Sequence, residues 1–245
     1  MFGLFKKKKI VPEFNFSNIG TDMHSHIIPG IDDGAQTIND SILLAKKFKS
    51  LGFKKLIATP HIMADYFRNT PDTINRNLDL LRKGIQEIQL DLEIDAAAEY
   101  YLDETLEKKV KQKEVLTFGS NYLLFELSYI NAPQNLFDTI KMMQDAGYKP
   151  VLAHPERYPY YYVSLENYSQ IKETGCLLQM NSIALTGYYG SGAKKVAEEM
   201  AENHWVDFIG SDMHHLKHAA ALEESLNTPI MQRLLSEHQL NNVLI

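Results

Sequence analysis

The sequence predicts an α/β fold in which parallel strands and helices alternate and close into a barrel. From residue 20 onward, short apolar runs alternate with longer segments whose apolar residues recur at helical spacing. Strands that alternate with helices form parallel sheets. Nearly every predicted strand ends in a polar residue, and the carboxyl ends of all barrel strands meet on one face. An open sheet would collect its ligands at one switch point instead, so the barrel is favoured.

Seven strands are predicted, each a short run rich in apolar residues. They cover Gly20–His24, Lys55–Thr59, Leu92–Ala98, Tyr122–Leu127, Pro150–Ala153, Leu177–Asn181 and Val206–Ser211. The predicted helices lie between them, at residues 38–48, 73–88, 134–146, 165–174 and 193–203.

The 245 residues suit one barrel domain over residues 20–245, preceded by a basic extension over residues 1–19. The lysines of this extension follow a very short apolar stretch, which is not the pattern of a cleaved signal peptide. We expect a solvated tail. The alternative is an electrostatic contact with anionic lipid or with a membrane-bound partner.

Charge and cysteine content exclude several classes of protein. The net charge is −6 without a basic stripe, which argues against nucleic-acid binding. No uncharged apolar run approaches transmembrane length, and the single cysteine, Cys176, excludes an internal disulfide. We expect a cytoplasmic protein, which the N-terminal lysines would bring to the inner face of the membrane if they bind lipid.

Two short motifs place ionisable residues two positions apart, where alternate side chains of a strand share a face. His24 and His26 would chelate one metal ion, and Asp22 on the same face would orient a histidine. Asp212 and His214 repeat this spacing at the end of the last strand. The first pair alone is also compatible with two surface histidines, but the second pair favours a metal site.

Further candidate ligands stand at other strand ends. His61 and His154 each follow a short apolar strand and lie beside a proline, which suits a rigid ligand position. Each alone is also compatible with a hydrogen-bonded core histidine. Glu99 follows the apolar run 94–98, and Asp33 lies in the loop after the first strand, where it would bring a carboxylate over the site.

The full set of candidate ligands is larger than one ion needs, since a catalytic zinc takes three protein ligands and a water. It therefore indicates two or three ions, with Glu99 as the bridge. Nitrogen and oxygen ligands without thiolate suit manganese, iron or zinc better than magnesium. Clustered divalent ions activate water and neutralise phosphoryl oxygens, so the predicted chemistry is hydrolysis of a phosphate ester.

Cationic and aromatic residues near these positions are candidates for substrate binding. Arg157 lies three residues past His154, and its guanidinium would grip two phosphoryl oxygens. Arg68, in the loop after His61, is a second candidate. Tyr158 opens an aromatic run that would either pack as a rim or form a slot for an aromatic ring.

A cysteine-based phosphatase mechanism is excluded. That mechanism needs an arginine six residues after the thiolate, whereas Ser182 stands six residues after Cys176. The chain also lacks a Gly-x-Ser-x-Gly nucleophile elbow and a nucleotide-type phosphate loop.

Taken in order along the chain, these motifs resemble the polymerase and histidinol phosphatase (PHP) superfamily. They are closest to the bacterial protein-tyrosine phosphatases of capsule and exopolysaccharide gene clusters. The resemblance covers about residues 20–218 and rests on His24-x-His26, Ile31-Asp32-Asp33-Gly34, Thr59-Pro60-His61, Glu99, His154-Pro155-Glu156-Arg157-Tyr158 and Ser211-Asp212-Met213-His214.

This resemblance implies a distorted (β/α)7, TIM-like barrel with three divalent ions, manganese being the first choice. It places His24, His26, Glu99 and Asp212 at one ion, Glu99, His61 and His154 at a second, and Asp33 with His214 at a third, which His61 would share. A metal-activated hydroxide would attack the phosphate, with Asp212 and His214 in catalytic roles. Arg157 matches the family arginine that grips the phosphotyrosine phosphate. The implied partner is a phosphorylated tyrosine autokinase of polysaccharide export, of the polysaccharide co-polymerase type.

Two alternatives stay open on the sequence. The first is a small-molecule phosphatase on the same barrel, such as one for histidinol phosphate, which would have a more enclosed pocket. The second is a catalytically inactive barrel that binds a partner; it predicts missing ligands, yet every ligand position of the motif set is occupied.

Overall fold

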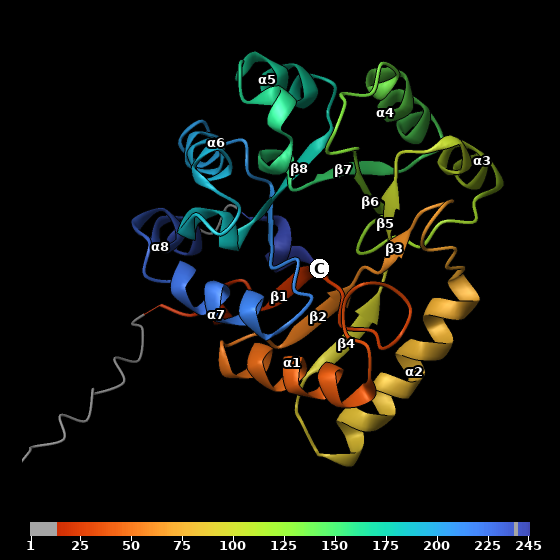
Figure 1. Cartoon of the computed structure of the whole chain (residues 1–245), viewed down its shortest axis with the longest axis vertical. Coiled ribbons are helices and arrows are strands. Elements are labelled where there is room, and N and C mark those ends of the chain that lie inside the picture. Colours follow the sequence, from red (N-terminus) through yellow and green to blue (C-terminus); the bar gives the residue numbers. More distant parts are fainter. Residues whose placement is uncertain (1–13, 238–239) are drawn as a thin grey trace, which may run out of the picture.

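The computed structural model describes residues 14–237 and 240–245, and it shows helices arranged around parallel strands (Figure 1). Three strands form the first sheet, hydrogen-bonded in the order β1 (Thr21–Ser25), β2 (Lys55–Ala58) and β4 (Glu93–Ala96). Six strands form the second, in the order β3 (His61–Ile62), β5 (Glu99–Tyr101), β6 (Tyr122–Glu126), β7 (Lys149–Ala153), β8 (Leu177–Asn181) and β9 (Phe208–Gly210). All of these pairings are parallel, which confirms the predicted α/β fold class.

Two of the seven predicted strands are each followed, after a bend, by a further short strand that was not predicted, β3 and β5. Pro60, which has no N–H to donate to a ladder, lies between β2 and β3, and residues 97–98 separate β4 from β5. Pairing continues across these bends, because the Glu99 N–H donates to the Pro60 carbonyl at 3.1 Å. Backbone hydrogen bonding therefore continues from the first sheet into the second at these bends.

The last strand meets the first through a few backbone contacts. The Asp212 N–H donates to the His24 carbonyl at 2.8 Å, and the His26 N–H donates to the Met213 carbonyl at 3.0 Å. Ser25 and Met213 also form an isolated parallel bridge. The strands thus make an irregular, TIM-like barrel that has no continuous ladder at this seam.

Helices surround the strands in Figure 1, and five of them lie at the predicted positions. These five are α1 (Ile38–Ser50), α2 (Pro71–Glu87), α4 (Leu136–Asp145), α5 (Glu166–Glu173) and α6 (Ser191–Glu202). Three further helices were not predicted from the sequence: α3 (Glu104–Gln112), α7 (Leu216–Ser225) and α8 (Pro229–Ser236). Helix α3 is short and highly charged, and it buries only Leu106 and Val110.

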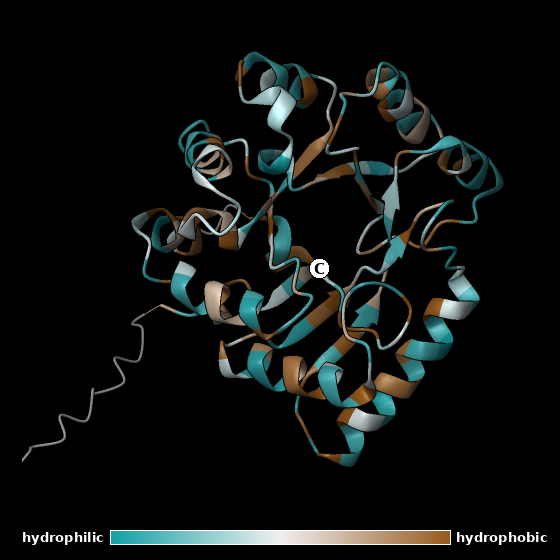
Figure 2. Cartoon of the chain, in the orientation of Figure 1, coloured by the Kyte–Doolittle hydropathy of each residue, from teal (hydrophilic) through white to brown (hydrophobic). Residues whose placement is uncertain are grey.

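The starts of α1 and α2 follow from local sequence. The Thr37 side chain accepts the Asp40 N–H, and the Asp40 carboxylate accepts the Thr37 N–H, which is a complete capping box. Thr70 caps α2 directly before Pro71, which is favourable at the first helical position. Hydrophobic and hydrophilic residues are mixed along both helices, as expected for helices with one buried face (Figure 2).

The packed part of the chain begins ahead of residue 20. Phe16 is fully buried, and its ring stacks on that of Phe53 with 4.6 Å between centroids. The N-terminal lysines and their predicted lipid or partner contact lie outside the described residues. Among the described helices, none is long and apolar enough to cross a bilayer.

Asn242 joins the first and last strands near the C-terminus, and its removal should destabilise the barrel. This fully buried side chain donates to the Thr21 and Ile209 carbonyls at 3.0 and 2.8 Å and accepts the Ile209 N–H at 3.0 Å. Asn242→Ala leaves these groups unpaired, so we expect the free energy of unfolding to fall by about 2–4 kcal/mol. Urea denaturation measures the change.

The neighbouring Asn241 supplies the matched control for this measurement. Its side chain makes no hydrogen bond to the described residues, so Asn241→Ala should change stability by about 0.5 kcal/mol or less. Equal losses in the two variants would show that the Asn242 hydrogen bonds do not stabilise the seam.

Candidate metal centre

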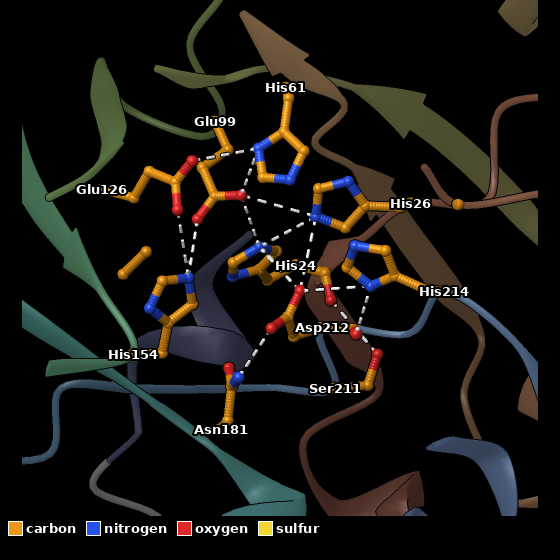
Figure 3. A network of polar contacts seen from close by, with 12 residues as sticks. His24, His26, His61, Glu99, Glu126, His154, Asn181, Ser211, Asp212 and His214 are labelled. Atoms are coloured by element: carbon orange, nitrogen blue, oxygen red, sulfur yellow. Dashed lines mark hydrogen bonds and ion pairs between the residues drawn. The ribbon is translucent and has the colours of Figure 1, made fainter. Parts of the chain in front are cut away.

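The carboxylate of Glu99 lies at the middle of a cluster of histidines at the strand ends (Figure 3). Its Oε2 atom is 3.3 Å from His24 Nε2, 3.4 Å from His26 Nε2 and 3.1 Å from His61 Nδ1. Its Oε1 atom is 2.9 Å from His154 Nε2. Four imidazoles, two of them at the end of β1, therefore surround one carboxylate, and Glu99 itself is fully buried.

Asp212 is the second shared carboxylate, and its two oxygens face different partners. Its Oδ1 atom is 3.5 Å from His24 Nε2, 3.4 Å from His26 Nε2 and 3.5 Å from His214 Nδ1. Its Oδ2 atom is 2.6 Å from an Arg157 nitrogen. One oxygen is thus directed into the histidine cluster and the other toward the cation.

Asp33 lies at the outer edge of the cluster. Its Oδ1 atom is 3.5 Å from His61 Nε2 and 3.4 Å from His214 Nε2. Its side chain is 57% exposed, in contrast to the buried Glu99 and Asp212. This edge of the cluster therefore opens toward solvent, where a substrate can approach.

Close packing of a loop on the end of β1 orients His26. A Cβ added at Gly34 would lie 2.0 Å from the His26 carbonyl oxygen, so only glycine fits there. Asp32, two residues earlier, accepts the Gly34 N–H at 2.9 Å and contacts His26 Nδ1 at 2.8 Å. Because Nδ1 is engaged by Asp32, Nε2 is left facing the cluster.

Gln179 of β8 orients His24 in the same way. Its Oε1 atom contacts His24 Nδ1 at 2.7 Å. Gly210 permits this approach, since a Cβ there would lie 2.7 Å from the His24 Cβ and 2.8 Å from Gln179 Nε2. Neither Asp32 nor Gln179 was predicted from the sequence as an orienting residue.

Asp22 was predicted to orient a histidine, but its hydrogen bonds go to Ser211. Asp22 accepts the Ser211 N–H at 2.8 Å and the Ser211 hydroxyl at 3.0 Å, and it does not hydrogen-bond a histidine. The register shifts between Asp22 and Ser25, and Gln179 already engages the His24 ring. Burial raises the pKa of Asp22 to about 7. Asp22 therefore ties β1 to the segment after β9 and does not orient a ligand.

The backbone is strained at two of the candidate ligands. His154 has φ of 34° and Asp212 has φ of 50°, in the left-handed region that disfavours side chains. Such strain persists where surrounding structure over-determines the conformation, and it gathers at functional sites.

The charges within the cluster fit bound cations. Burial and the charge of His26 lower the pKa of His61. The opposite effect of Glu99 and Glu126 is larger, and the pKa of His61 is raised to about 10. Burial opposes ionisation of Glu99, yet the neighbouring charges of His24 and His61 hold its pKa well below the ordinary value. Without ions, His24, His26 and His61, whose pKa values nearby carboxylates raise, therefore carry protons that a metal would displace, whereas burial lowers the pKa of His154.

Two buried atoms in the cluster support the same fit. Glu99 Oε2 and His61 Nδ1 make no geometrically acceptable hydrogen bond to the described residues. Buried polar atoms without partners are rare, and a metal ion would satisfy both.

Four overlapping groups of side chains bring their ligand atoms within 4.8 Å of one another. They are His26, Asp33, His61 and His214; His24, Glu99 and His154; His24, His26 and Asp212; and His61, Glu99 and Glu126. The structure therefore brings together all eight predicted ligands. It adds Glu126, whose Oε1 is 3.2 Å from His61 Nδ1 and which lies within the predicted strand Tyr122–Leu127 but was not predicted as a ligand.

A cavity of about 510 Å³ opens above the cluster. Arg157 lines it, and the guanidinium carbon lies 4.8 Å from the ring centre of Tyr129 and 4.3 Å from that of Tyr189. These contacts hold the guanidinium between two aromatic rings. Tyr66 and Phe67 line the same cavity.

Two predicted substrate-binding residues do not line this cavity. Tyr158 is fully buried, and its hydroxyl accepts the Leu127 N–H at 2.9 Å and donates to the Ala153 carbonyl at 3.0 Å. The packing interpretation of Tyr158 is therefore the correct one. Arg68 is exposed and donates to the Ala64 carbonyl at 2.7 Å. Tyr129 and Tyr189, which the sequence analysis did not single out, take the aromatic positions beside Arg157.

The single cysteine lies away from the cluster. Cys176 is fully buried directly before β8, and burial raises the pKa of its thiol well above the ordinary value. A buried thiol with a raised pKa is a poor nucleophile. This agrees with the exclusion of a cysteine-based mechanism.

The fold and the cluster together define an α/β barrel protein with a histidine and carboxylate centre suited to several divalent ions. The family model described as "Capsular polysaccharide synthesis, CpsB/CapC" matches residues 20–245. The chain belongs to this family.

Two curated relatives of this chain are named tyrosine-protein phosphatases. The chain is 28% identical over 197 residues to the tyrosine-protein phosphatase YwqE of Bacillus subtilis, covering 80% of this chain and 78% of that protein. It is 29% identical over 202 residues to the tyrosine-protein phosphatase CpsB of Streptococcus pneumoniae, covering 80% and 83%.

Solved structures agree with this membership. One from a study of YwqE and CpsB, described as metal-dependent tyrosine phosphatases, matches with a TM-score of 0.78 and 27% identity, over 91% of this chain and 94% of that one. The lactonase Lmo2620 of Listeria monocytogenes shares the fold, with a TM-score of 0.56 and 15% identity over 94% and 91%.

Glu156, two residues after His154, should make stability depend on pH. It is fully buried; Oε1 accepts the Asn181 N–H at 2.9 Å, and Oε2 has no hydrogen-bond partner among the described residues. Burial raises the pKa of Glu156 to about 8. Because this folded-state pKa exceeds the unfolded value, the folded state binds more protons than the unfolded state at any pH between the two pKa values. The free energy of unfolding should therefore fall as pH rises from about 5 to about 8.

Glu156→Gln, which keeps the shape of the neutral acid, should remove about 2 kcal/mol of this fall. Urea unfolding of metal-free protein at about pH 6 and about pH 8.5 measures it. Exposed Glu202→Gln is the matched control and should leave the pH dependence unchanged. The same pH dependence in wild type and Glu156→Gln would contradict a neutral Glu156.

Proposed function

We propose that this chain hydrolyses phosphotyrosine in proteins, using divalent metal ions held by the histidine and carboxylate cluster. One observation carries the proposal: an arginine held between two tyrosine rings lies 2.6 Å from a candidate metal ligand, Asp212, at the floor of an open cavity. Membership of the CpsB/CapC family, whose named relatives are tyrosine-protein phosphatases, supports it.

We propose three ions, with manganese as the first choice and iron or zinc as alternatives. His24, His26, Glu99 and Asp212 would hold one, Glu99, Glu126, His61 and His154 a second, and Asp33, His61 and His214 a third. Such ions lower the pKa of a bound water, orient phosphoryl oxygens and neutralise charge on the leaving oxygen.

The side chains of the chain itself position the substrate. Arg157 would direct its guanidinium at two phosphoryl oxygens, since Tyr129 and Tyr189 restrict its movement. His214 lies at the cavity wall beside Asp33, and a metal ion held by these two residues would neutralise charge on the leaving phenolate oxygen. Asp212 would fix the position of Arg157 relative to the metal ions, because its Oδ1 faces the histidine cluster and its Oδ2 contacts Arg157.

The rim of the cavity favours a tyrosine on a protein over a small metabolite. Tyr66 is 79% exposed and Tyr129 is 39% exposed, and both line the cavity. Exposed aromatic rings at a mouth provide contact area for another macromolecule. They leave histidinol phosphate, a metabolite that suits an enclosed pocket, as the weaker alternative.

The proposed partner is the protein that carries the phosphotyrosine. A tyrosine kinase of polysaccharide export, phosphorylated on its own tyrosines, would present the substrate, and its membrane attachment would bring this chain to the inner face of the membrane. The family's description in capsular polysaccharide synthesis supports this assignment.

Removal of metal should abolish phosphotyrosine hydrolysis. We expect chelator-treated protein to lose at least about 100-fold in kcat and to recover on addition of manganese, because no side chain here replaces metal-activated water. Asp212→Ala should lose a similar factor in metal-loaded protein. Release of phosphate from a phosphotyrosine peptide measures both; full activity in chelator together with full activity of Asp212→Ala would refute the proposal.

Arg157→Lys should lower kcat/KM for phosphotyrosine by about 10- to 100-fold, since lysine keeps the charge but cannot grip two oxygens or stack between the rings. Arg68→Lys, at an exposed arginine outside the cavity, is the matched control and should change kcat/KM by less than about twofold. Similar losses in the two variants would remove Arg157 from the phosphate-binding role.

A further inference from the structure

A second hollow adjoins the cavity of the metal centre. It has a volume of about 440 Å³ and is lined by Leu43 and Leu44 of α1, the loop 34–36, and the segment 214–217. His214 and His215 line both this hollow and the cavity above the metal cluster. The two spaces are therefore neighbours across a wall of two histidines.

The hollow is apolar where a solvent-facing surface is usually polar. Leu43 is 50% exposed and Leu216 is 55% exposed, and they come from different helices. A single exposed leucine is ordinary, but two that line one concave space form a patch of the kind found at binding sites. Leu44 beneath them is 2% exposed and belongs to the core.

Charge around the hollow is balanced. Asp40 and Lys217 both line it and carry opposite charges. Neither a strongly acidic nor a strongly basic ligand is therefore favoured. The chemistry of the lining suits an uncharged, apolar group.

We propose that this hollow binds an apolar side chain of the phosphorylated protein, one or two residues from the phosphotyrosine. The inference rests on the proposed function, because the phosphotyrosine fixes the peptide above the metal cluster. An extended peptide advances about 3.3 Å per residue, so a residue one or two positions from the phosphotyrosine can reach a hollow that shares the wall of His214 and His215. Leu43 and Leu216 are then specificity-determining residues for the sequence around the tyrosine.

The test compares three substrates with wild type and a Leu43→Asn, Leu216→Asn double variant, both loaded with manganese. Two substrates are phosphotyrosine peptides that differ only in having leucine or serine at the two positions on each side. The third is p-nitrophenyl phosphate, which is too small to reach the hollow. Wild type should prefer the leucine peptide by about tenfold in kcat/KM, mainly through KM, since burying one such side chain is worth about that factor.

The double variant should lose this preference and keep its kcat/KM for p-nitrophenyl phosphate within about twofold. Leu80→Asn is the matched control, because Leu80 is 56% exposed on α2 and lines neither space. It should retain the preference. Thermal unfolding of each variant checks that the substitutions leave the fold intact.

Several results would overturn the inference. One is an undiminished leucine preference in the folded double variant; another is an equal loss in Leu80→Asn. Tighter binding of a peptide with acidic residues, removed by Lys217→Gln, would assign the hollow to a charged ligand. A wild-type dimer in light scattering that dissociates in the double variant would assign it to a second copy. Failure of metal-loaded wild type on all three substrates would instead refute the proposed function itself.

Discussion

The contact between Glu99 and four imidazoles is the constraint on which the rest of the site depends. A buried carboxylate is costly unless opposite charges surround it, and here His24, His26, His61 and His154 do so at 2.9–3.4 Å. Without ions, protons on His24, His26 and His61 supply those charges, and His154 contributes a hydrogen-bond contact at 2.9 Å. With ions, the same geometry offers nitrogen and oxygen ligands around shared positions. His24, His26 and His154 stand at or just beyond the ends of β1 and β7. His61 and Glu99 are the first residues of β3 and β5, after the bends that follow β2 and β4. The barrel must therefore place these strands correctly before the cluster can form.

The fold meets this requirement through close contacts between segments, at positions where only glycine fits. Gly34 lets the loop after β1 touch His26, and Gly210 lets Gln179 reach His24. Asp212 keeps a left-handed backbone while one oxygen faces the histidines and the other faces Arg157. Arg157, which we propose binds the phosphate, and the candidate metal ligands are therefore linked through Asp212, so a change at either should disturb the other.

Much of this arrangement could be predicted from sequence because it is local. Alternation along a strand places His24 and His26 on one face, and an apolar run that ends in histidine marks a strand end. Contacts between distant segments carry no such signal. Gln179, 155 residues from His24, is one example, and Tyr129 beside Arg157 is another. Tyr158 adjoins Arg157 in sequence, but its backbone direction sends the ring into the core.

The most direct test of this account is the metal content of Glu99→Gln measured together with its activity. Glu99 is shared between two of the proposed ion positions, so its conversion to an amide should weaken both. We expect wild type loaded with manganese to hold about three ions per chain and Glu99→Gln to hold about one, with phosphotyrosine hydrolysis reduced by at least about 100-fold. Full metal content and full activity in folded Glu99→Gln would contradict the account.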